Sequence, residues 1–270
     1  MSQKLHTRTS HSMSHEHKLD DVIEFVHDNA VDVICLTETW HDYDSTAVSR
    51  LRASGFNVVD RPRPRIRQDL SVNHGGILLF SSFQLSILPF ASPSSFELLV
   101  VRVVFGHRPA AIVAVIYRPG STPIQQRFFE DLTSVLERAA TYAAPIYVVG
   151  DVNIRLDRAN DPHTIQFQSL MASFNLSVQA TGATHARGGT LDVVASSEPV
   201  TVSVVDVGLS DHHAIRWQSL DGDVQRSAPP PTRSSSAVKL VRPWRRLDLD
   251  DFRSALISSR LCQPDSWPVD

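Results

Sequence analysis

Cysteine is almost absent from this chain of 270 residues, which contains only Cys35 and Cys262. Two cysteines so far apart in the sequence give no basis for a disulfide framework or for a zinc cluster. Cys35 stands inside the apolar run "VDVICLTE", where we interpret it as a small core residue. We therefore expect a reducing, intracellular compartment.

The sequence also lacks long apolar runs and a strong charge of either sign. The N-terminus "MSQKLHTRTSHSMSHEHK" has no apolar stretch typical of a secretory signal, and no run approaches the length that spans a bilayer. The net charge of −3 excludes a general attraction to nucleic acid, so such a contact requires local basic patches. With 42% hydrophobic and 20% charged residues, the composition is that of a globular protein, and we expect no membrane partner.

Composition divides the chain into three expected parts. Residues 1–17 are polar and rich in histidine, which predicts a disordered or degraded segment, with a metal-binding tract as the alternative. Residues 18–220 are long enough for one large domain. Residues 221–270 contain the linker-like stretch "APPPTRSSSA", and then a helical pattern that belongs to a linker element or to a further domain. We expect the chain to be a monomer.

Apolar periodicity predicts an α/β fold. Helical spacing occurs in "KLDDVIEFVHDN" (18–29) and "TIQFQSLMASFN" (164–175), and the strand-like runs outnumber such segments. Two of these runs, "ELLVVRVVF" and "AAIVAVIY", follow each other without a helix between them, as in a hairpin. Adjacent strands of this kind favour mixed or antiparallel sheets that are covered by helices.

Several of these apolar runs end in polar residues that suit catalysis. In "PIYVVGDVNIR" (145–155) a buried strand passes directly into Gly150, Asp151 and Asn153. These residue types also form turns, so this stretch alone permits a simple turn. Other candidates that end or flank apolar runs are Glu38, Tyr117, Arg118, Asp192, Ser210, Asp211 and His212. Each of them alone also permits a plain structural role, such as a solvent-facing strand end or a surface pair.

Together these residue types suit the hydrolysis of a phosphodiester. Mg²⁺ takes oxygen ligands, usually one or two carboxylates with water and substrate phosphate, and Glu38 with Asp151 and Asn153 would supply them. A histidine beside a carboxylate is a common base or electrostatic partner. His212 fits this role with either Asp192 or Asp211 as its carboxylate.

The ordered motifs "LTETW", "YRPG", "GDVN", "GGTLDVV" and "SDHHAI" resemble the endonuclease/exonuclease/phosphatase superfamily, which includes deoxyribonuclease I and the abasic-site endonucleases. Within it, "CLTETW", "YRPG" and "GGTLDVV" resemble the endonuclease domain of non-LTR (LINE-type) retrotransposon polyproteins. The tail "RPWRRLDLDDFRSAL" resembles the connector before their reverse transcriptase. The resemblance implies a four-layer α/β sandwich, in which helices flank two packed mixed β-sheets.

The resemblance also implies an activity and partners. It implies a Mg²⁺-dependent DNA endonuclease, with Mn²⁺ as an alternative ion, that nicks target DNA and leaves a 3′-hydroxyl for reverse transcription. The implied partners are DNA and, in a complete polyprotein, a C-terminal reverse transcriptase. The implied compartment is the nucleus when the substrate is chromosomal DNA.

Matching motifs carry roles from the family to individual residues. Glu38 and Asp211 match metal ligands, and Tyr117 matches a tyrosine near the scissile phosphate. Asp151 matches the residue that orients or activates water, and Asn153 one that contacts the phosphate. His212, paired with Asp211, matches a phosphate-binding histidine, whereas Asp192 matches an acidic position with a less defined role. Further candidates for DNA or phosphate binding are Arg118, Thr190, Ser210, Arg61, Arg63 and Arg65. The last three lie in "RPRPRIRQ", which a solvated charged loop would also explain.

The N-terminus departs from the family pattern, which begins with a strand that ends in an asparagine of the site. No asparagine precedes Asn29, and residues 1–17 contain no apolar run. We therefore expect the first strand and its amide to be missing, as in a truncated or decayed copy. Three hypotheses stay open: a DNA endonuclease, a phosphatase or RNA phosphodiesterase of the same superfamily, and an inactive remnant that retains only DNA binding.

Overall fold

The computed structural model describes residues 4–9, 16–64, 74–106, 109–179, 181–208, 210–220, 254 and 257–258. Contacts divide the chain into two units, Met1–Arg226 and Ser227–Asp270. Within the described part of the chain, the first unit contains the strands β1–β12 and the helices α1–α4. Among the described residues, no helix has the length and apolar character needed to cross a bilayer.

The first sheet has six strands and combines segments from the start, middle and end of this unit. In spatial order they are β11 (Val200–Val205), β12 (Ala214–Ser219), β1 (Lys4–Thr9), β2 (Val33–Thr37), β4 (Ile77–Ser81) and β3 (Asn57–Arg61). Strands β1 and β2 run parallel, and the other neighbours are antiparallel. The sheet is therefore mixed, as the sequence predicted.

The second sheet also has six strands and one parallel pair. In spatial order they are β5 (Gln84–Ile87), β6 (Glu97–Val104), β7 (Ala111–Tyr117), β8 (Ile146–Asp151), β10 (Asp192–Ser196) and β9 (Ser177–Val178). Strands β7 and β8 are parallel and the other neighbours antiparallel. The helix α3 (Gln126–Ala139) makes the crossover between β7 and β8.

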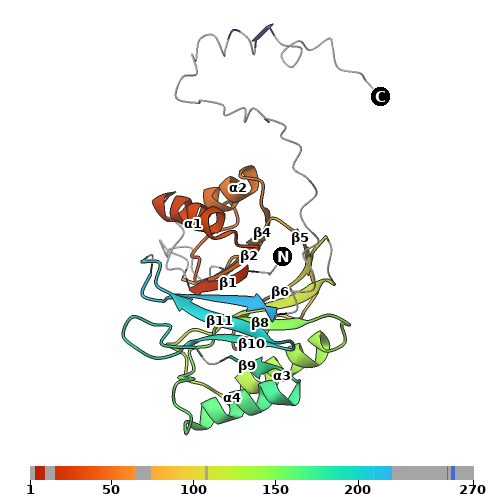
Figure 1. The fold of residues 1–270 in the computed structure, drawn as a ribbon, viewed down its shortest axis with the longest axis vertical. Helices are drawn as coiled ribbons and strands as arrows, with labels where there is room; N and C mark the ends of the chain where they lie inside the picture. Colours follow the sequence, from red (N-terminus) through yellow and green to blue (C-terminus); the bar gives the residue numbers. More distant parts are fainter. Residues whose placement is uncertain are drawn as a thin grey trace. The chain divides into compact units, whose positions relative to one another are not determined.

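The sheets pack face to face and helices cover their outer faces, which confirms the predicted four-layer α/β fold (Figure 1). One core cluster joins side chains of both sheets, with Trp217 of β12 and Tyr147 of β8 fully buried in it. The helices α1 (Glu16–Asn29) and α2 (Thr46–Ala53) cover the first sheet. The helices α3 and α4 (Pro162–Ser173) cover the second. Alternate faces of the buried strands thus supply both the central core and the two outer cores.

The expectation of a missing first strand was wrong. Strand β1 lies between β12 and β2, with Leu5 opposite Val33 and Thr7 opposite Ile215. Part of the segment that we expected to be disordered, residues 1–17, is therefore a central strand. A strand ladder is made by backbone N–H and C=O groups that every residue except proline carries. The sequence "KLHTRT" satisfies this ladder without an apolar run, so its hydrophobic pattern did not indicate a strand.

Candidate active site

Strand register aligns three of the predicted residues across neighbouring strands of the second sheet. Tyr117 of β7 lies opposite Asp151 of β8, and Asp151 lies opposite Asp192 of β10. Residues directly opposite on adjacent strands share a face, with Cβ atoms about 4.5–5.5 Å apart. The sheet therefore brings together side chains that are far apart in the sequence.

Gly150 permits this close arrangement of β7 and β8. Its φ is +123°, and a Cβ atom at this position would lie 2.1 Å from the Ile116 carbonyl oxygen. Only glycine tolerates both the backbone conformation and the approach of β7. The glycine of "VVGDVN" therefore supports the site by its backbone, one residue before Asp151.

His212 pairs with Asp192, which decides between the two carboxylates that the sequence left open. The distance from His212 Nδ1 to Asp192 Oδ2 is 2.9 Å, and both side chains are buried. Burial opposes the charged imidazolium, but the hydrogen bond and the charge of Asp192 outweigh it and raise the pKa of His212 to about 9. His212 is therefore cationic at neutral pH, as a partner for a phosphate requires.

Asp151 and Asn153 form one unit at the end of β8. The Asn153 backbone N–H donates to Asp151 Oδ1 at 2.9 Å, and Asn153 Nδ2 donates to Asp151 Oδ2 at 2.9 Å. Burial raises the pKa of Asp151 above its ordinary value, and the Asp192 charge adds to this while His212 opposes it. A carboxyl group with a raised pKa is suited to accept a proton from water near neutral pH.

Glu38 lies in the loop after β2 of the first sheet and contacts the last residue of β7. The Tyr117 hydroxyl donates a hydrogen bond to Glu38 Oε1, which links the end of β7 to the loop after β2. Glu38 has a φ of +52°, in the left-handed region that side chains other than glycine rarely adopt, and the Trp40 N–H donates to the Gly75 carbonyl at 2.7 Å. Backbone conformations of this kind concentrate at functional sites. Burial first, and then Glu38, raise the pKa of Tyr117, so that its hydroxyl stays protonated.

A network that we did not predict supports the Glu38 loop from the adjacent side. Thr39 Oγ1 lies 2.5 Å from His41 Nδ1, and His41 Nε2 lies 3.3 Å from Asp60 Oδ2. The His41 hydrogen bond is the main cause that lowers the pKa of Asp60. The only signal in the sequence was a histidine three residues after Glu38, and it did not indicate that its partner lies on β3.

Asp211 faces a second histidine that the sequence did not single out. His185 Nε2 lies 3.5 Å from Asp211 Oδ2, and the His185 and His212 rings pack edge to face at 4.8 Å. His185 Nδ1 accepts the Arg187 backbone N–H at 3.0 Å, which places the ring proton of neutral His185 on Nε2. His185 therefore directs an N–H toward the Asp211 carboxylate and is a positioning residue.

Arg118, which we predicted to contact a phosphate, organises the site through backbone carbonyls, and its contact with a phosphate stays a prediction. Its guanidinium is bonded to the carbonyls of Val152 at 2.7 Å, Asn153 at 2.6 Å, Thr122 at 2.6 Å and Pro119 at 3.2 Å. These bonds occupy four of the five N–H donors of an arginine, and the residue is only 3% exposed. Arg118 thus holds the loop after β8 in place and has little surface for a ligand.

The other predicted phosphate-binding residues also have intramolecular partners. Ser210 Oγ donates to the His212 carbonyl at 2.9 Å and accepts its N–H at 3.1 Å. Thr190 Oγ1 donates to the Gly182 carbonyl at 2.9 Å. Arg61 donates to the Leu98 carbonyl at 2.7 Å, and Arg63 forms an ion pair with Glu97. Arg65 lies outside the described residues. Their contacts with a phosphate stay predictions.

The donor set fits a hard divalent cation. The ligand atoms of Asp151, Asp192 and His212 lie within 4.8 Å of one another, and the charge of Glu38 contributes to the raised pKa of Asp151. Cationic His212 has no lone pair for a metal, so the carboxylates are the ligands that this grouping offers. Buried carboxylates in excess of nearby cations are costly unless a positive charge offsets them. A second grouping, His185, Asp211 and His212, is equally compact. In it, the Nε2 of neutral His185 carries a proton and so offers no lone pair to a metal.

The sequence matches the model of the endonuclease/exonuclease/phosphatase family over residues 13–212, so the chain belongs to this family. A comparison with curated protein sequences gave no significant match. The 3′ phosphatase NExo from Neisseria, bound to a product DNA hairpin, is 19% identical with a TM-score of 0.62. That match covers 80% of this chain and 99% of NExo.

Two further solved structures share this fold. The endonuclease domain of TRAS1, a telomere-specific non-LTR retrotransposon, is 14% identical with a TM-score of 0.60, covering 81% of this chain and 98% of that domain. The AP endonuclease LMAP from Leishmania major is 15% identical with a TM-score of 0.61, covering 81% of this chain and 87% of LMAP. The fold is thus the one shared by these nucleases and phosphatases.

Proposed function

We propose that this protein is a metal-dependent DNA endonuclease that uses Mg²⁺ or Mn²⁺ to hydrolyse a phosphodiester bond and nick one strand. The observation that carries the proposal is the meeting of three pairs at one end of the two sheets: Asp192 with His212, Asp151 with Asn153, and Glu38 with Tyr117. Hydrolysis of a phosphodiester requires a base for water, donors for the phosphoryl oxygens and charge stabilisation. These pairs supply each of these functions.

Each residue has a role that follows from its environment. Asp151, whose pKa is raised, accepts a proton from the attacking water. Cationic His212 donates an N–H to a phosphoryl oxygen, and Asp192 keeps it charged and oriented. The Tyr117 hydroxyl donates to Glu38, and the two Asn153 amide N–H groups donate to Asp151 and to the Arg118 carbonyl, so these two residues position the carboxylates of the site. Glu38 and the Asp151 carboxylate would hold the cation, which would supply charge neutralisation when bound. That Asp211 is a further ligand stays a prediction from the family resemblance.

The finer role that we propose is the nicking of target DNA for retrotransposition. The motifs "CLTETW" and "GGTLDVV" and the fold shared with the TRAS1 endonuclease domain support it. In this role the nick leaves a 3′-hydroxyl that primes a reverse transcriptase in the same polyprotein. The nucleus is then the compartment in which the enzyme acts on chromosomal DNA.

Two other functions are alternatives to this proposal. The fold shared with a 3′ phosphatase keeps a phosphatase or an RNA phosphodiesterase in consideration. The absence of an asparagine before Asn29 favours an inactive remnant that binds DNA without cleaving it. Turnover of plasmid DNA, RNA and a phosphoinositide, measured side by side, separates the nuclease from the other hydrolases.

The decisive experiment is nicking of supercoiled plasmid by the purified chain with Mg²⁺, Mn²⁺ or EDTA. Asp151→Asn should reduce nicking by about 10³-fold or more, because a catalytic carboxylate is replaced by an amide without basicity. Glu130→Gln, the same chemical change on an exposed residue of α3, is the matched control and should nick normally. A folded wild-type chain that nicks no better with metal than with EDTA would contradict the proposal and favour the remnant.

A further inference from the structure

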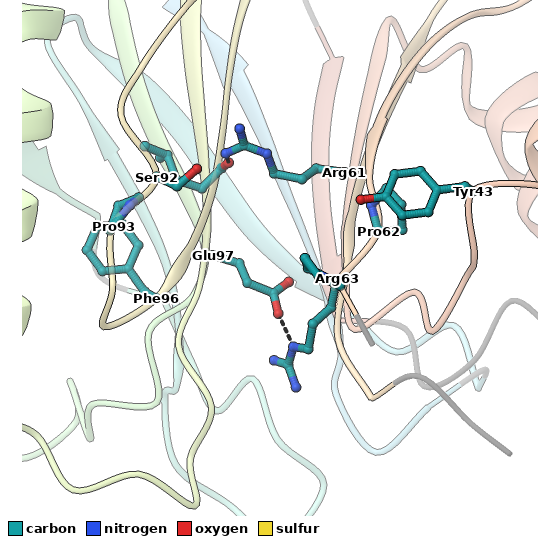
Figure 2. A pocket seen from close by; sticks show the side chains of 10 residues that line it. Tyr43, Arg61, Pro62, Arg63, Ser92, Pro93, Phe96 and Glu97 are labelled. Carbon is teal, nitrogen blue, oxygen red and sulfur yellow. Dashed lines mark hydrogen bonds and ion pairs between the residues drawn. The ribbon is translucent and has the colours of Figure 1, made fainter. Parts of the chain in front are cut away.

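A pocket of about 300 Å³ lies beside the active site, between the end of β3 and the segment that leads into β6. Figure 2 shows Tyr43 and Pro62 on one side and Pro93 and Phe96 on the other, with the Arg61 and Arg63 side chains extending between them. We call this the side pocket. Its volume is at the lower end of the range for small-ligand sites.

Arg63 connects the side pocket to the catalytic residues. Its guanidinium carbon lies 5.4 Å from the centre of the Tyr117 ring, and its Nε is bonded to Glu97. Glu97 lies opposite Tyr117 in the strand register and accepts the Gly76 N–H at 2.7 Å. A DNA strand with its phosphate at Tyr117 would therefore place a neighbouring nucleotide at the pocket.

The lining combines flat apolar surface with positive charge. Tyr43 is 76% exposed, whereas Phe96 is 5% exposed and forms part of the core. The charge of Glu97 is offset by Arg63, and Arg61 adds a further positive charge among the described residues that line the pocket. The exposed ring offers a stacking surface for a base, and the arginine offers a donor for phosphate.

We propose that the side pocket holds one unstacked nucleotide of the DNA strand next to the scissile phosphate, with its base against Tyr43 and its phosphate near Arg61. This inference rests on the proposed DNA endonuclease function. A paired base is enclosed by its neighbours and its partner, so it cannot enter a walled pocket unless it leaves the stack. A base that is already unpaired avoids this cost and should bind more tightly.

The test compares two labelled DNA duplexes that differ only in one unpaired nucleotide. Binding is measured by fluorescence anisotropy in Ca²⁺, for wild type, Tyr43→Ala and Tyr43→Phe. Wild type should prefer the bulged duplex by about 5-fold or more, the value of one base stacked on an aromatic ring. Tyr43→Ala should lose this preference, and Tyr43→Phe, which keeps the ring, should retain it. Ile165→Ala, which also truncates an exposed large hydrophobic side chain, but on α4, is the control and should behave as wild type.

The inference is overturned if wild type shows no preference for the bulged duplex, or if Tyr43→Ala keeps it. Thermal unfolding of each variant checks that the fold persists, as expected for a side chain that is 76% exposed. Plasmid nicking with Mg²⁺ is measured separately. Nicking without a bulge preference would contradict the nucleotide site in the side pocket and leave the endonuclease proposal intact. A bulge preference without nicking would support the nucleotide site and contradict the endonuclease proposal.

Discussion

Replacing Asp192 by asparagine should change the pH dependence of nicking more than its maximum rate. Asp192 is the carboxylate that holds His212 in its charged form, through a hydrogen bond of 2.9 Å. Asparagine has nearly the same shape but no charge, so the substitution removes the cause of the raised pKa and leaves the packing in place. The pKa of His212 should then fall from about 9 toward its ordinary value of 6.5, because burial, which lowers it, is opposed by the remaining charges of Asp151 and Asp211, which raise it.

The size of the effect follows from these two pKa values. At pH 8, a pKa of about 9 keeps roughly 90% of His212 cationic, whereas 6.5 leaves roughly 3%. The variant should therefore lose about 30-fold in nicking at pH 8, but less than about 2-fold at pH 6. The charge of Asp192 also raises the pKa of Asp151, so its removal extends the ionised form of Asp151 to lower pH. Both effects move the optimum of the variant toward acid.

The assay is the rate of plasmid nicking by wild type and Asp192→Asn from pH 5.5 to pH 9.5 at saturating Mg²⁺. An NMR titration of the His212 ring in both proteins measures the pKa directly. An equal loss at pH 6 and pH 8 would refute the reasoning, because it would show that Asp192 acts by binding metal or by packing. An unchanged His212 titration would refute it independently of activity.

Three further outcomes are expected. Gly150→Ala should lower the free energy of unfolding by about 3 kcal/mol or more, because the new Cβ atom would lie 2.1 Å from the Ile116 carbonyl oxygen. Urea denaturation measures this free energy, and a variant as stable as wild type would contradict the role of Gly150. Arg118→Lys should lower stability and nicking together, because a lysine cannot reach four carbonyls at once, whereas the exposed control Arg158→Lys should change neither. Because the pKa of His212 is raised in the folded protein, this residue contributes fully to the free energy of unfolding below about pH 6.5, and the contribution is lost as the pH rises through about 9. The melting temperature of wild type should therefore fall over this pH range more than that of Asp192→Asn.

The sequence by itself determined the class of fold and most of the candidate site. Buried strands such as "IYVV" are visible because hydrophobic burial requires continuous apolar runs, and Asp151 and Asn153 are visible because they follow such a run directly. Glu38, Tyr117 and His212 were found in the same way. These predictions depended on local composition, which the linear order of residues contains.

Only the tertiary structure decided how these residues are paired. The choice of Asp192 rather than Asp211 for His212 depends on how the segment before β12 lies against the start of β10. The central position of β1 depends on backbone ladders that "KLHTRT" does not reveal. The same holds for His185, which contacts Asp211, and for Arg118, which is bonded to Val152 and Asn153, 34 and 35 residues further along the chain. The physical reason is that hydrogen bonds and burial act through space, and strand pairing and loop closure bring these groups within reach only in the folded chain.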